Sequence, residues 1–430
     1  MKIVIIGAGS ASFGPAILGD LALHAGLIGE TEIWLVDTNA ESLDTMARFA
    51  TRLFGEAGLK FAVHQTVDRT AALPGANFVI VSIAVDRLET WKLDWQIPLR
   101  HGVRHVLGEN GGPGGLSHAL RNIPLLLGIA HDVERLAPSA LILNFTNPLS
   151  RLCLALHRHS RVRFAGLCHQ LGEGYRLVNQ VLGLADGSDQ HAIEQRLHLV
   201  AAGLNHFSFI LDMRDRQTGA DLYPLFRQRL AAMPASFEPM SRRLYDTFGL
   251  FCATGDGHAG EYVGYAADTM ALTGYDFDAR SEHSSNQWRW VRSVADGQAP
   301  PTLKASGERA APIIAAIVRD LNQHELSANL PNRGCIENMS PDAIVELPAT
   351  VNATGVHGVH VGALPRGLAA MLNQQVEIQE LVVEAAVHGD RKAALQALLI
   401  DPTVRSYMQA DHMLDDLLKA HAAHLPQFAT

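Results

Sequence analysis

Residues 1–14, MKIVIIGAGSASFG, lead a short apolar run directly into a glycine-rich turn, and this stretch decides the fold. The next residues, 15–23 (PAILGDLAL), have the apolar spacing of a helix. A second apolar run, EIWLVD at 32–37, ends in an acid. A strand, a glycine-rich turn, a helix and a second strand in this order predict a βαβ unit.

Three more apolar runs continue this alternation of strands and helices. They are FVIVSIAV (78–85), ALILNFTNP (140–148) and RFAGLCHQ (163–170), with a helical pattern over 118–137. We therefore expect an α/β protein with a Rossmann-like, doubly wound parallel sheet over residues 1–200. Longer helical patterns at 308–323 and 367–389 predict a second, mixed α+β domain over residues 201–430.

The charged residues are spread along the chain without a long run of either sign. There are 35 basic and 44 acidic residues, giving a net charge of -9. This balance argues against nucleic acid or an anionic membrane as a partner and favours small molecules. No apolar run reaches the roughly 20 residues that a bilayer needs, and no signal peptide is visible, so we expect a cytoplasmic protein. The four cysteines lack the spacing of a disulfide framework and should be thiols.

The glycine-rich turn has the chemistry of a dinucleotide site. Gly7 and Gly9 allow a sharp bend that brings backbone N–H groups close to a pyrophosphate at the start of a helix. Asp37 follows the second strand, where a carboxylate accepts both ribose hydroxyls and disfavours a 2'-phosphate, so NAD is expected rather than NADP. The usual third glycine is replaced by Phe13 or by Gly14, depending on the alignment. The residues expected to contact the cofactor are Gly7, Gly9, Ser10, Phe13 and Asp37.

Two segments that follow strands could bring polar side chains to the same edge of the sheet, where ligands bind in this fold. The stretch GENGGPGGLSHALRNIP (108–124) presents Glu109 and Asn110 before a helix, although it could also be an ordinary flexible loop. The stretch NFTNPLS (144–150) presents Asn147, for which a capping role is the alternative.

A cysteine and a histidine complete the set of chemically capable residues at this edge. Cys168 stands at the end of one predicted strand, and His206 interrupts the apolar pattern of another. Either residue alone would be read as an ordinary core residue. Together, a thiolate and an imidazole would form half of a metal shell that substrate oxygens and water complete, and the softness of the thiolate favours zinc.

The motifs together resemble those of glycoside hydrolase family 4, the NAD- and manganese-dependent glycosidases. They are GAGSASF, GENGGPGGLSHALRNIP, NFTNPLSRL, GLCH, GLNHF, GHAGEYVGY and the late segment from NLPNRGC to VGALP. They cover nearly the whole chain in the family's order. The resemblance implies a fold of the lactate and malate dehydrogenase type, with NAD and Mn²⁺ or another divalent metal as cofactors.

The resemblance also implies an elimination mechanism, which sets this family apart from glycosidases that use two carboxylates. NAD⁺ takes hydride from C3 of the terminal sugar, which acidifies the proton at C2. A base removes that proton, the metal stabilises the enediolate, and the glycosidic oxygen leaves from C1. Water then adds and the hydride returns. Because the C2 proton is removed and replaced, the released sugar should exchange its C2 hydrogen with solvent.

Roles follow for individual residues from the same resemblance. Cys168 and His206 are the expected metal ligands, and Tyr262 is the expected C2 base. Glu109 falls where the family usually has an aspartate that binds sugar hydroxyls. Because a phenol titrates near pH 10, Tyr262 needs a nearby cation or metal; an ordinary core tyrosine is the alternative. Substrate contacts are expected from Asn110, Asn147 and His169, and assistance from Asp256, His258 or Glu261.

The substrate is left open at the level of the sugar. His169, directly after the cysteine, resembles the α-glycosidase groups of the family, which favours an unphosphorylated α-linked hexoside. A hexuronide, another acidic sugar or a sulfoquinovoside would need an arginine, and Arg289, Arg292 and Arg333 are candidates. The sequence Glu-Asn-Gly-Gly at 109–112 departs from the family and does not decide between these sugars.

Two other kinds of protein fit part of the pattern. An NAD-dependent hydroxy-acid or sugar dehydrogenase would keep the fold but need no Cys–His metal pair, so its activity would survive a chelator. A non-catalytic NAD-binding sensor would tolerate the change of Tyr262 to Phe. A homodimer or homotetramer is the usual assembly for such a fold.

Overall fold

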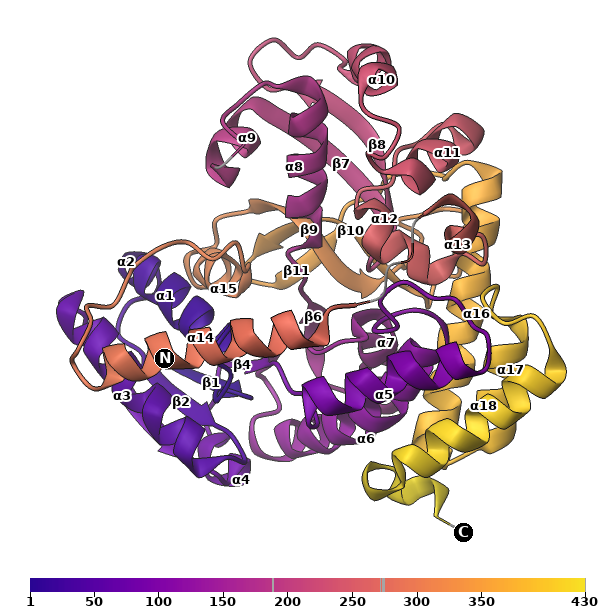
Figure 1. Ribbon diagram of the computed structural model, residues 1–430. Helices are drawn as coiled ribbons and strands as arrows, with labels where there is room; N and C mark the ends of the chain where they lie inside the picture. The colour runs from indigo at the N-terminus through magenta and orange to yellow at the C-terminus, as the bar shows by residue number, and fades with distance from the viewer. Residues whose placement is uncertain (188, 271, 273–274, 430) are drawn as a thin grey trace.

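Six parallel strands begin one continuous mixed sheet in the computed structural model, which describes residues 1–187, 189–270, 272 and 275–429 (Figure 1). The parallel strands are β1 (Lys2–Ile6), β2 (Glu32–Val36), β3 (Ala62–Thr66), β4 (Phe78–Val81), β5 (Leu141–Asn144) and β6 (Arg163–Gly166). Their order in the sheet is β3-β2-β1-β4-β5-β6, the order of a doubly wound dinucleotide-binding fold. The predicted α/β class is thereby confirmed.

The sheet continues beyond β6 with antiparallel strands. These are β7 (Leu197–Leu204), β8 (Phe207–Asp215), β9 (Gln323–Pro331), β10 (Ile344–Asn352) and β11 (Gly355–Gly358). They extend the sheet in the order β9-β10-β7-β8, while β11 pairs with β10. The two parts of the chain therefore share one sheet, and β7 runs across the boundary expected after residue 200. The division into two domains stays a prediction.

Helices cover both faces of the sheet. In the first half they are α1 (Phe13–Leu23), α2 (Ala25–Ile28), α3 (Ala40–Glu56), α4 (Arg69–Ala72), α5 (Arg87–Arg100), α6 (Gly112–Leu136), α7 (Leu149–His159), α8 (Gln170–Leu182) and α9 (Gln190–Arg196). The rest are α10 (Tyr223–Ala232), α11 (Pro239–Phe248), α12 (Gly255–Ala259), α13 (Ala266–Thr269), α14 (Phe277–Ala295), α15 (Ala310–Arg319), α16 (Arg366–His388), α17 (Arg391–Ile400) and α18 (Tyr407–Ala420). Among the described residues, no helix is long and apolar enough to span a bilayer.

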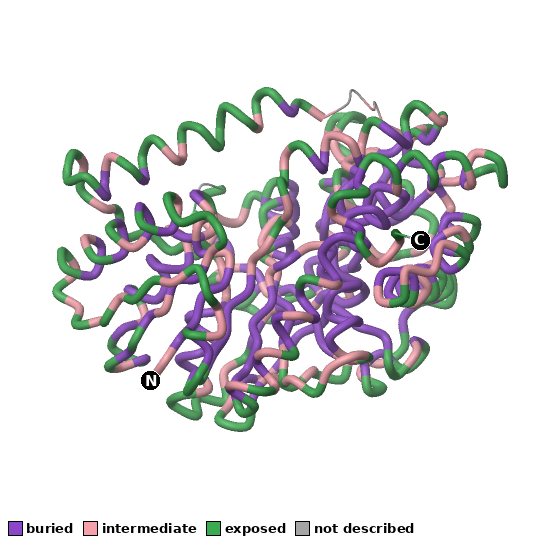
Figure 2. The backbone as a smooth tube through the Cα atoms, turned by 90° about the horizontal axis from the view of Figure 1, so that it is seen from below, coloured by how far each residue is buried: buried purple, intermediate pink, exposed green. Residues whose placement is uncertain are grey.

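Strand β1 shows why the parallel strands are apolar throughout. Successive side chains of a strand point to opposite faces, and here helices bury both faces. Val4 and Ile6 join the core under α6, α7, α17 and α18. Ile3 and Ile5 join the core under α1, α3 and α15. Buried chain therefore gathers in the middle of the molecule and exposed chain at its outside (Figure 2).

The structure sets several boundaries differently from the apolar patterns. The strand expected over 78–85 ends at Val81, and residues 82–86 form a loop beside the site described below. The helix expected over 118–137 begins earlier, at Gly112, because the glycine-rich stretch supplies its first turn. Strand β3 has largely exposed polar residues, since it lies at the edge of the sheet, and it carried no apolar signal.

Candidate active site

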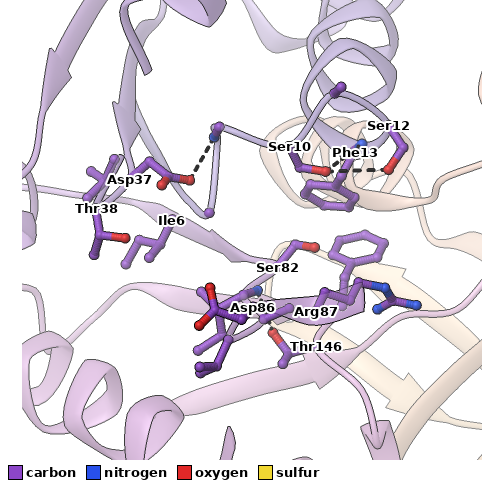
Figure 3. Close-up of a pocket in the computed structure, with 18 of the residues that line it drawn as sticks. Ile6, Ser10, Ser12, Phe13, Asp37, Thr38, Ser82, Asp86, Arg87 and Thr146 are labelled. Carbon is purple, nitrogen blue, oxygen red and sulfur yellow. Dashed lines mark hydrogen bonds between the residues drawn. The ribbon is translucent and has the colours of Figure 1, made fainter. Parts of the chain in front are cut away.

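The turn after β1 borders a cavity of about 1130 Å³, shown in Figure 3. This volume slightly exceeds the usual range of ligand pockets, roughly 300–1,000 Å³. The five residues expected to contact a dinucleotide, Gly7, Gly9, Ser10, Phe13 and Asp37, all line it. The cavity also reaches Thr146 and Asn147 after β5, so it extends along the carboxyl ends of the parallel strands.

Gly7 and Gly9 shape the floor of this cavity. Gly7 has φ +87°, and a Cβ there would lie 1.9 Å from the carbonyl oxygen of Ser82. Only glycine fits such a position. The N–H of Gly9 donates a hydrogen bond of 2.8 Å to Oδ2 of Asp37. The acid expected to accept the ribose hydroxyls therefore stands directly against the glycine-rich turn.

Gly14 takes the packing role of the third glycine, which the sequence left between two positions. A Cβ on Gly14 would lie 2.8 Å from the carbonyl oxygen of Ala8 and 2.8 Å from Cε of Met46. Phe13 instead presents its ring to the cavity and packs on Phe145, with 5.0 Å between the ring centroids. Helix α1 can approach the turn closely because position 14 has no side chain.

Helix α14 forms the opposite wall of the cavity. It crosses the molecule in front of the parallel strands and packs against α3 and α5 (Figure 1). The cavity-lining residues of α14 are Arg280, Ser281, Ser284, Ser285, Gln287 and Trp288. The second half of the chain thus closes a pocket whose floor comes from the first half.

Cys168 and His206 meet beyond the ends of their strands. Sγ of Cys168, two residues after β6, lies 3.2 Å from Nε2 of His206. His206 is in the turn between β7 and β8 rather than in a strand, with φ +63°. This left-handed conformation costs a non-glycine residue about 1–2 kcal/mol, and such strain is common at functional sites.

The chemistry of this pair suits a divalent cation. Burial, together with nearby His258, holds the pKa of His206 well below its usual value. The imidazole is therefore neutral, which is the form that binds a metal ion. Burial also raises the pKa of the Cys168 thiol far above its usual value, so the thiolate needs a cation beside it. Within the described part of the chain, no third His, Cys, Asp or Glu joins the pair in a metal cluster.

Tyr262 lies close to the pair, at the end of a short 3-10 turn over residues 260–262. Its ring stacks on Phe207, and its hydroxyl donates a hydrogen bond of 3.3 Å to the carbonyl oxygen of Asn205, the neighbour of His206. Burial raises the pKa of Tyr262 well above its usual value, Glu261 raises it further, and Arg151 lowers it. Arg151 thus acts in the direction that the sequence required of a cation near Tyr262, although burial keeps the pKa of the phenol raised.

Glu109 is a buried acid that stays ionised. Its Oε1 accepts a hydrogen bond of 2.5 Å from Arg87, and its carbonyl oxygen contacts Nδ1 of His118 at 3.0 Å. Although burial raises the pKa of the Glu109 carboxyl, the charges of Arg87 and nearby histidines lower it to about 2. Arg87 also lines the cavity beside the glycine-rich turn, so it links the two parts of the candidate site.

Glu261 holds the loop that carries Glu109 and Asn110. Oε2 of Glu261 accepts hydrogen bonds from the N–H groups of Glu109, Asn110 and Gly111 at 2.8, 2.7 and 3.1 Å. Three donors around one carboxylate oxygen form a strong charge-assisted anchor. The side-chain amide of Asn110 is buried, and neither its oxygen nor its nitrogen has a hydrogen-bond partner. Unpartnered buried polar groups are rare, and here they suit a sugar hydroxyl.

The remaining predicted residues have no described hydrogen bond with the Cys168–His206 pair. Asn147 lines the dinucleotide cavity, and its carbonyl oxygen accepts from Asn122. The ring of His169 is more than half exposed, and its Nδ1 lies 3.1 Å from Oε1 of Glu308, which raises the pKa of His169. The arginines proposed for an acidic sugar make no described contact with Cys168 or His206; they are Arg289, Arg292 and Arg333.

Arg87 and Arg151 were not identified from the sequence as residues of the site. Arg151 stands in LSRLCLAL (149–156), where one charge interrupts a run of apolar and small residues, and this interruption was the available signal. Arg87 gave no such signal, because it begins an ordinary polar helix. Its contact with Glu109 depends on how α5 and the loop before α6 pack in three dimensions.

Comparison with known proteins gives a consistent result over the whole chain. Residues 2–184 match the family model "Family 4 glycosyl hydrolase", and residues 201–404 match its C-terminal domain. The chain is 36% identical to an alpha-glucosidase of Erwinia rhapontici over 93% of each chain. It is 29% identical to an alpha-galactosidase of Bacillus subtilis over 99% of each chain.

Two solved structures place the fold. A 6-phospho-alpha-glucosidase from gut microorganisms, solved in complex with NAD and Mn²⁺, has a TM-score of 0.86 at 23% identity. The alignment covers 100% of this chain and 99% of that one. The malate dehydrogenase of Plasmodium falciparum has a TM-score of 0.53 at 14% identity, over 90% and 98% of the two chains. The fold is thus shared with the dehydrogenases as well.

Proposed function

The chain belongs to the family 4 glycosyl hydrolases, and on that premise we propose that it cleaves an α-linked hexoside by an NAD-dependent elimination. The steps are oxidation at C3, elimination between C1 and C2, addition of water and reduction back at C3. When bound, NAD supplies the hydride acceptor and a divalent cation supplies the Lewis acid for the sugar oxygens. Membership of the family confirms the resemblance drawn from the motifs.

The observation that carries this proposal is the distance of 3.2 Å between Sγ of Cys168 and Nε2 of His206. A dehydrogenase needs no such pair, and the contact brings a thiol and an imidazole together at the carboxyl edge of the sheet, where ligands bind in this fold. These two side chains would hold the cation. Gly7, Gly9, Ser10, Phe13 and Asp37 would hold the dinucleotide.

The protein's own side chains have separate tasks in this scheme. Tyr262 takes the proton from C2, which requires that its hydroxyl first lose its own proton. Glu109 is ionised and accepts hydrogen bonds from sugar hydroxyls, while the amide of Asn110 both donates and accepts. Asn147 and His169 complete the contacts with the sugar. Burial of Tyr262, Glu109 and His206 excludes bulk water from the reacting carbons.

The relatives act on different sugars: one is a probable 6-phospho-beta-glucosidase at 30% identity, several are alpha-galacturonidases, and two carry names that favour a neutral α-linked hexoside. The two described above are an alpha-glucosidase and an alpha-galactosidase. The arginines suggested for a carboxylate or sulfonate on the sugar lie along α14 and in the turn after β9, without a described contact to the Cys168–His206 pair. We therefore expect neutral α-hexosides to be preferred over hexuronides and sulfoquinovosides.

A substrate panel tests the proposed reaction. Nitrophenyl α-hexosides, α-hexuronides and sulfoquinovosides are assayed with NAD⁺, Mn²⁺ and a reductant that keeps Cys168 reduced. We expect hydrolysis of a neutral α-hexoside that stops when EDTA is added and returns when Mn²⁺ is restored. If activity survives chelation and NADH is released, the proposed glycosidase reaction is wrong and the protein is a dehydrogenase.

Direct titration of metal tests the ligand pair without relying on turnover. We expect the change Cys168→Ser to weaken Mn²⁺ binding by at least tenfold in calorimetry. The change Cys335→Ser, at a cysteine outside the site, serves as the matched control and should bind Mn²⁺ like the unchanged protein. Equal affinity in both variants would remove Cys168 from the metal site. Repeating the titration with Zn²⁺ tests whether the soft thiolate prefers that metal.

A further inference from the structure

Arg151, in the first turn of α7, is a buried charge that the proposed reaction has not used. The residue is only 2% exposed, and its Nη1 has no hydrogen-bond partner. Its guanidinium forms no salt bridge with any residue that the structure describes. By contrast, Arg121, equally buried on α6, is paired with Asp94 at 2.5 Å.

An unpaired buried guanidinium is energetically unfavourable. Burial lowers the pKa of Arg151, yet arginine keeps its charge in proteins. The desolvation penalty for such an ion amounts to several kcal/mol. A charge held in this way is typical of sites where a negative charge develops during function, because the field is already in place when that charge forms.

Three groups near Arg151 can carry a negative charge: Tyr262, Asp401 and Glu261. Asp401 already accepts hydrogen bonds from the N–H and the hydroxyl of Thr403. Glu261 already accepts from three backbone N–H groups through Oε2. The phenol of Tyr262 is different, because its hydroxyl is a donor here and its oxygen would carry a charge only after losing the proton.

The first turn of α6 lies between Arg151 and the segment that carries Tyr262. A Cβ on Gly115 would lie 2.9 Å from Nη1 of Arg151, and a Cβ on Gly111 would lie 2.5 Å from the carbonyl oxygen of Glu261. Helix α16 packs against both α6 and α7, and its Gln375 donates a hydrogen bond of 3.3 Å to the carbonyl oxygen of Tyr262. Arg151 and Tyr262 are thus held in fixed positions around the same glycine-rich turn.

We propose that Arg151 is a positioning residue for Tyr262. The guanidinium of Arg151 is the fixed counter-charge of the Tyr262 phenolate, which takes the C2 proton. This inference rests on the proposed function, in which Tyr262 is the base. Four titratable or charged groups act on the Tyr262 phenol. Glu261, Glu346 and Cys168 raise its pKa, as does burial, and Arg151 is the group that lowers it.

The pH dependence of kcat/KM tests this role. The base must be deprotonated, so activity rises with pH through its pKa, and removal of Arg151 raises that pKa. We expect Arg151→Met to move the acid limb to higher pH by about one unit or more, since one unit corresponds to roughly a tenfold difference in ionisation. Arg151→Lys keeps the charge and should leave the limb closer to that of the unchanged enzyme. Arg158→Met, at a partly exposed arginine on the same helix, should not move it.

The assay uses the full chain with NAD⁺, Mn²⁺ and both a neutral α-hexoside and an α-hexuronide. A uniform loss of kcat/KM at every pH would mean that Arg151 is only structural. A raised KM for the hexuronide alone would mean that Arg151 binds a substrate carboxylate. Either result overturns the proposal. If thermal melting shows that Arg151→Met does not fold, Arg151→Gln takes its place with the same expected shift.

This experiment distinguishes a failure of the proposed reaction from a failure of the proposed role of Arg151. An unchanged protein that shows no NAD⁺- and Mn²⁺-dependent hydrolysis overturns the proposed function and this inference together. An unchanged protein that hydrolyses the hexoside, combined with an unmoved acid limb in Arg151→Met, overturns only the role of Arg151.

Discussion

Arg87 is the strongest of the charges that keep Glu109 ionised. The carboxyl is buried, which favours its neutral form, and Arg87 at 2.5 Å, together with nearby histidines, outweighs that burial. Because the pKa falls from 4.5 to about 2, the ionised pair stabilises the fold above pH 4.5, and this stabilisation is lost as the pH falls toward 2. The stabilisation is on the order of 3 kcal/mol.

Removing Arg87 should reverse this behaviour. In Arg87→Met, only the nearby histidines still oppose burial, so the pKa of Glu109 rises and the acid loss of stability begins at higher pH. Melting temperatures between pH 3 and 7 measure this shift. Arg135→Met, which breaks an exposed pair with Asp132, is the control and should follow the unchanged protein. The same acid dependence in Arg87→Met would contradict the assigned pair.

At the scale of the element, the glycine-rich turn and α1 act as one unit. Helix α1 can bring its N-terminus to a pyrophosphate only because Gly14 has no side chain to hold the helix away from Ala8. The fingerprint spacing is longer than usual, with four residues between Gly9 and Gly14. A glycine is still needed where α1 packs against Ala8, because this close contact depends on the position of the helix and not on the length of the turn.

Gly14→Ala should therefore weaken NAD⁺ binding. The added Cβ would meet Ala8 and Met46 at 2.8 Å, so α1 must move away from the turn. We expect at least a tenfold loss of NAD⁺ affinity, measured by calorimetry, together with a lower melting temperature. Gly26→Ala, in α2, is the control, since nothing lies within 4 Å of its added Cβ. Unchanged affinity in Gly14→Ala would contradict this account of the turn.

The end of the loop before α6 is held by three hydrogen bonds to one side chain, Glu261. Glu261→Gln removes the charge that binds three N–H groups, and a lost charged hydrogen bond costs roughly 1.5–3 kcal/mol. We expect faster proteolysis within residues 104–112 and a lower kcat, because Glu109 and Asn110 lose their support. Limited trypsin digestion followed by mass spectrometry locates the cleavage. A loop as resistant as that of the unchanged protein would show that Glu261 is not its anchor.

At the scale of the whole molecule, both halves of the chain build one site. Cys168 and Glu109 come from the parallel half, and His206, Glu261 and Tyr262 come from the segment after β7. Helices α16 and α18 then pack back on α5, α6 and α7, so the end of the chain supports the helices that begin at the site. The site depends on this return of the chain more than on either half alone.

Features that depend on residues close together in the sequence could be predicted, and contacts between distant segments could not. Local patterns were enough for the parallel strands other than β3 and for the turn at Gly7 and Gly9, since these depend on neighbouring residues. Strand β3 was not predicted because an exposed edge strand needs no apolar run. The pairing of Cys168 with His206 was expected from strand ends and family resemblance. The contacts of Arg87, Arg151 and Glu261 were not, because they form between elements that are distant in the sequence.

The central claim is that the sugar loses and regains its C2 proton during hydrolysis. Turnover of the preferred α-hexoside in D₂O, with NAD⁺, Mn²⁺ and reductant, followed by NMR of the released sugar, measures this directly. The account predicts deuterium at C2 of the hydrolysed sugar and none in product formed by acid hydrolysis. Enzymatic product that keeps its original hydrogen at C2 would contradict it.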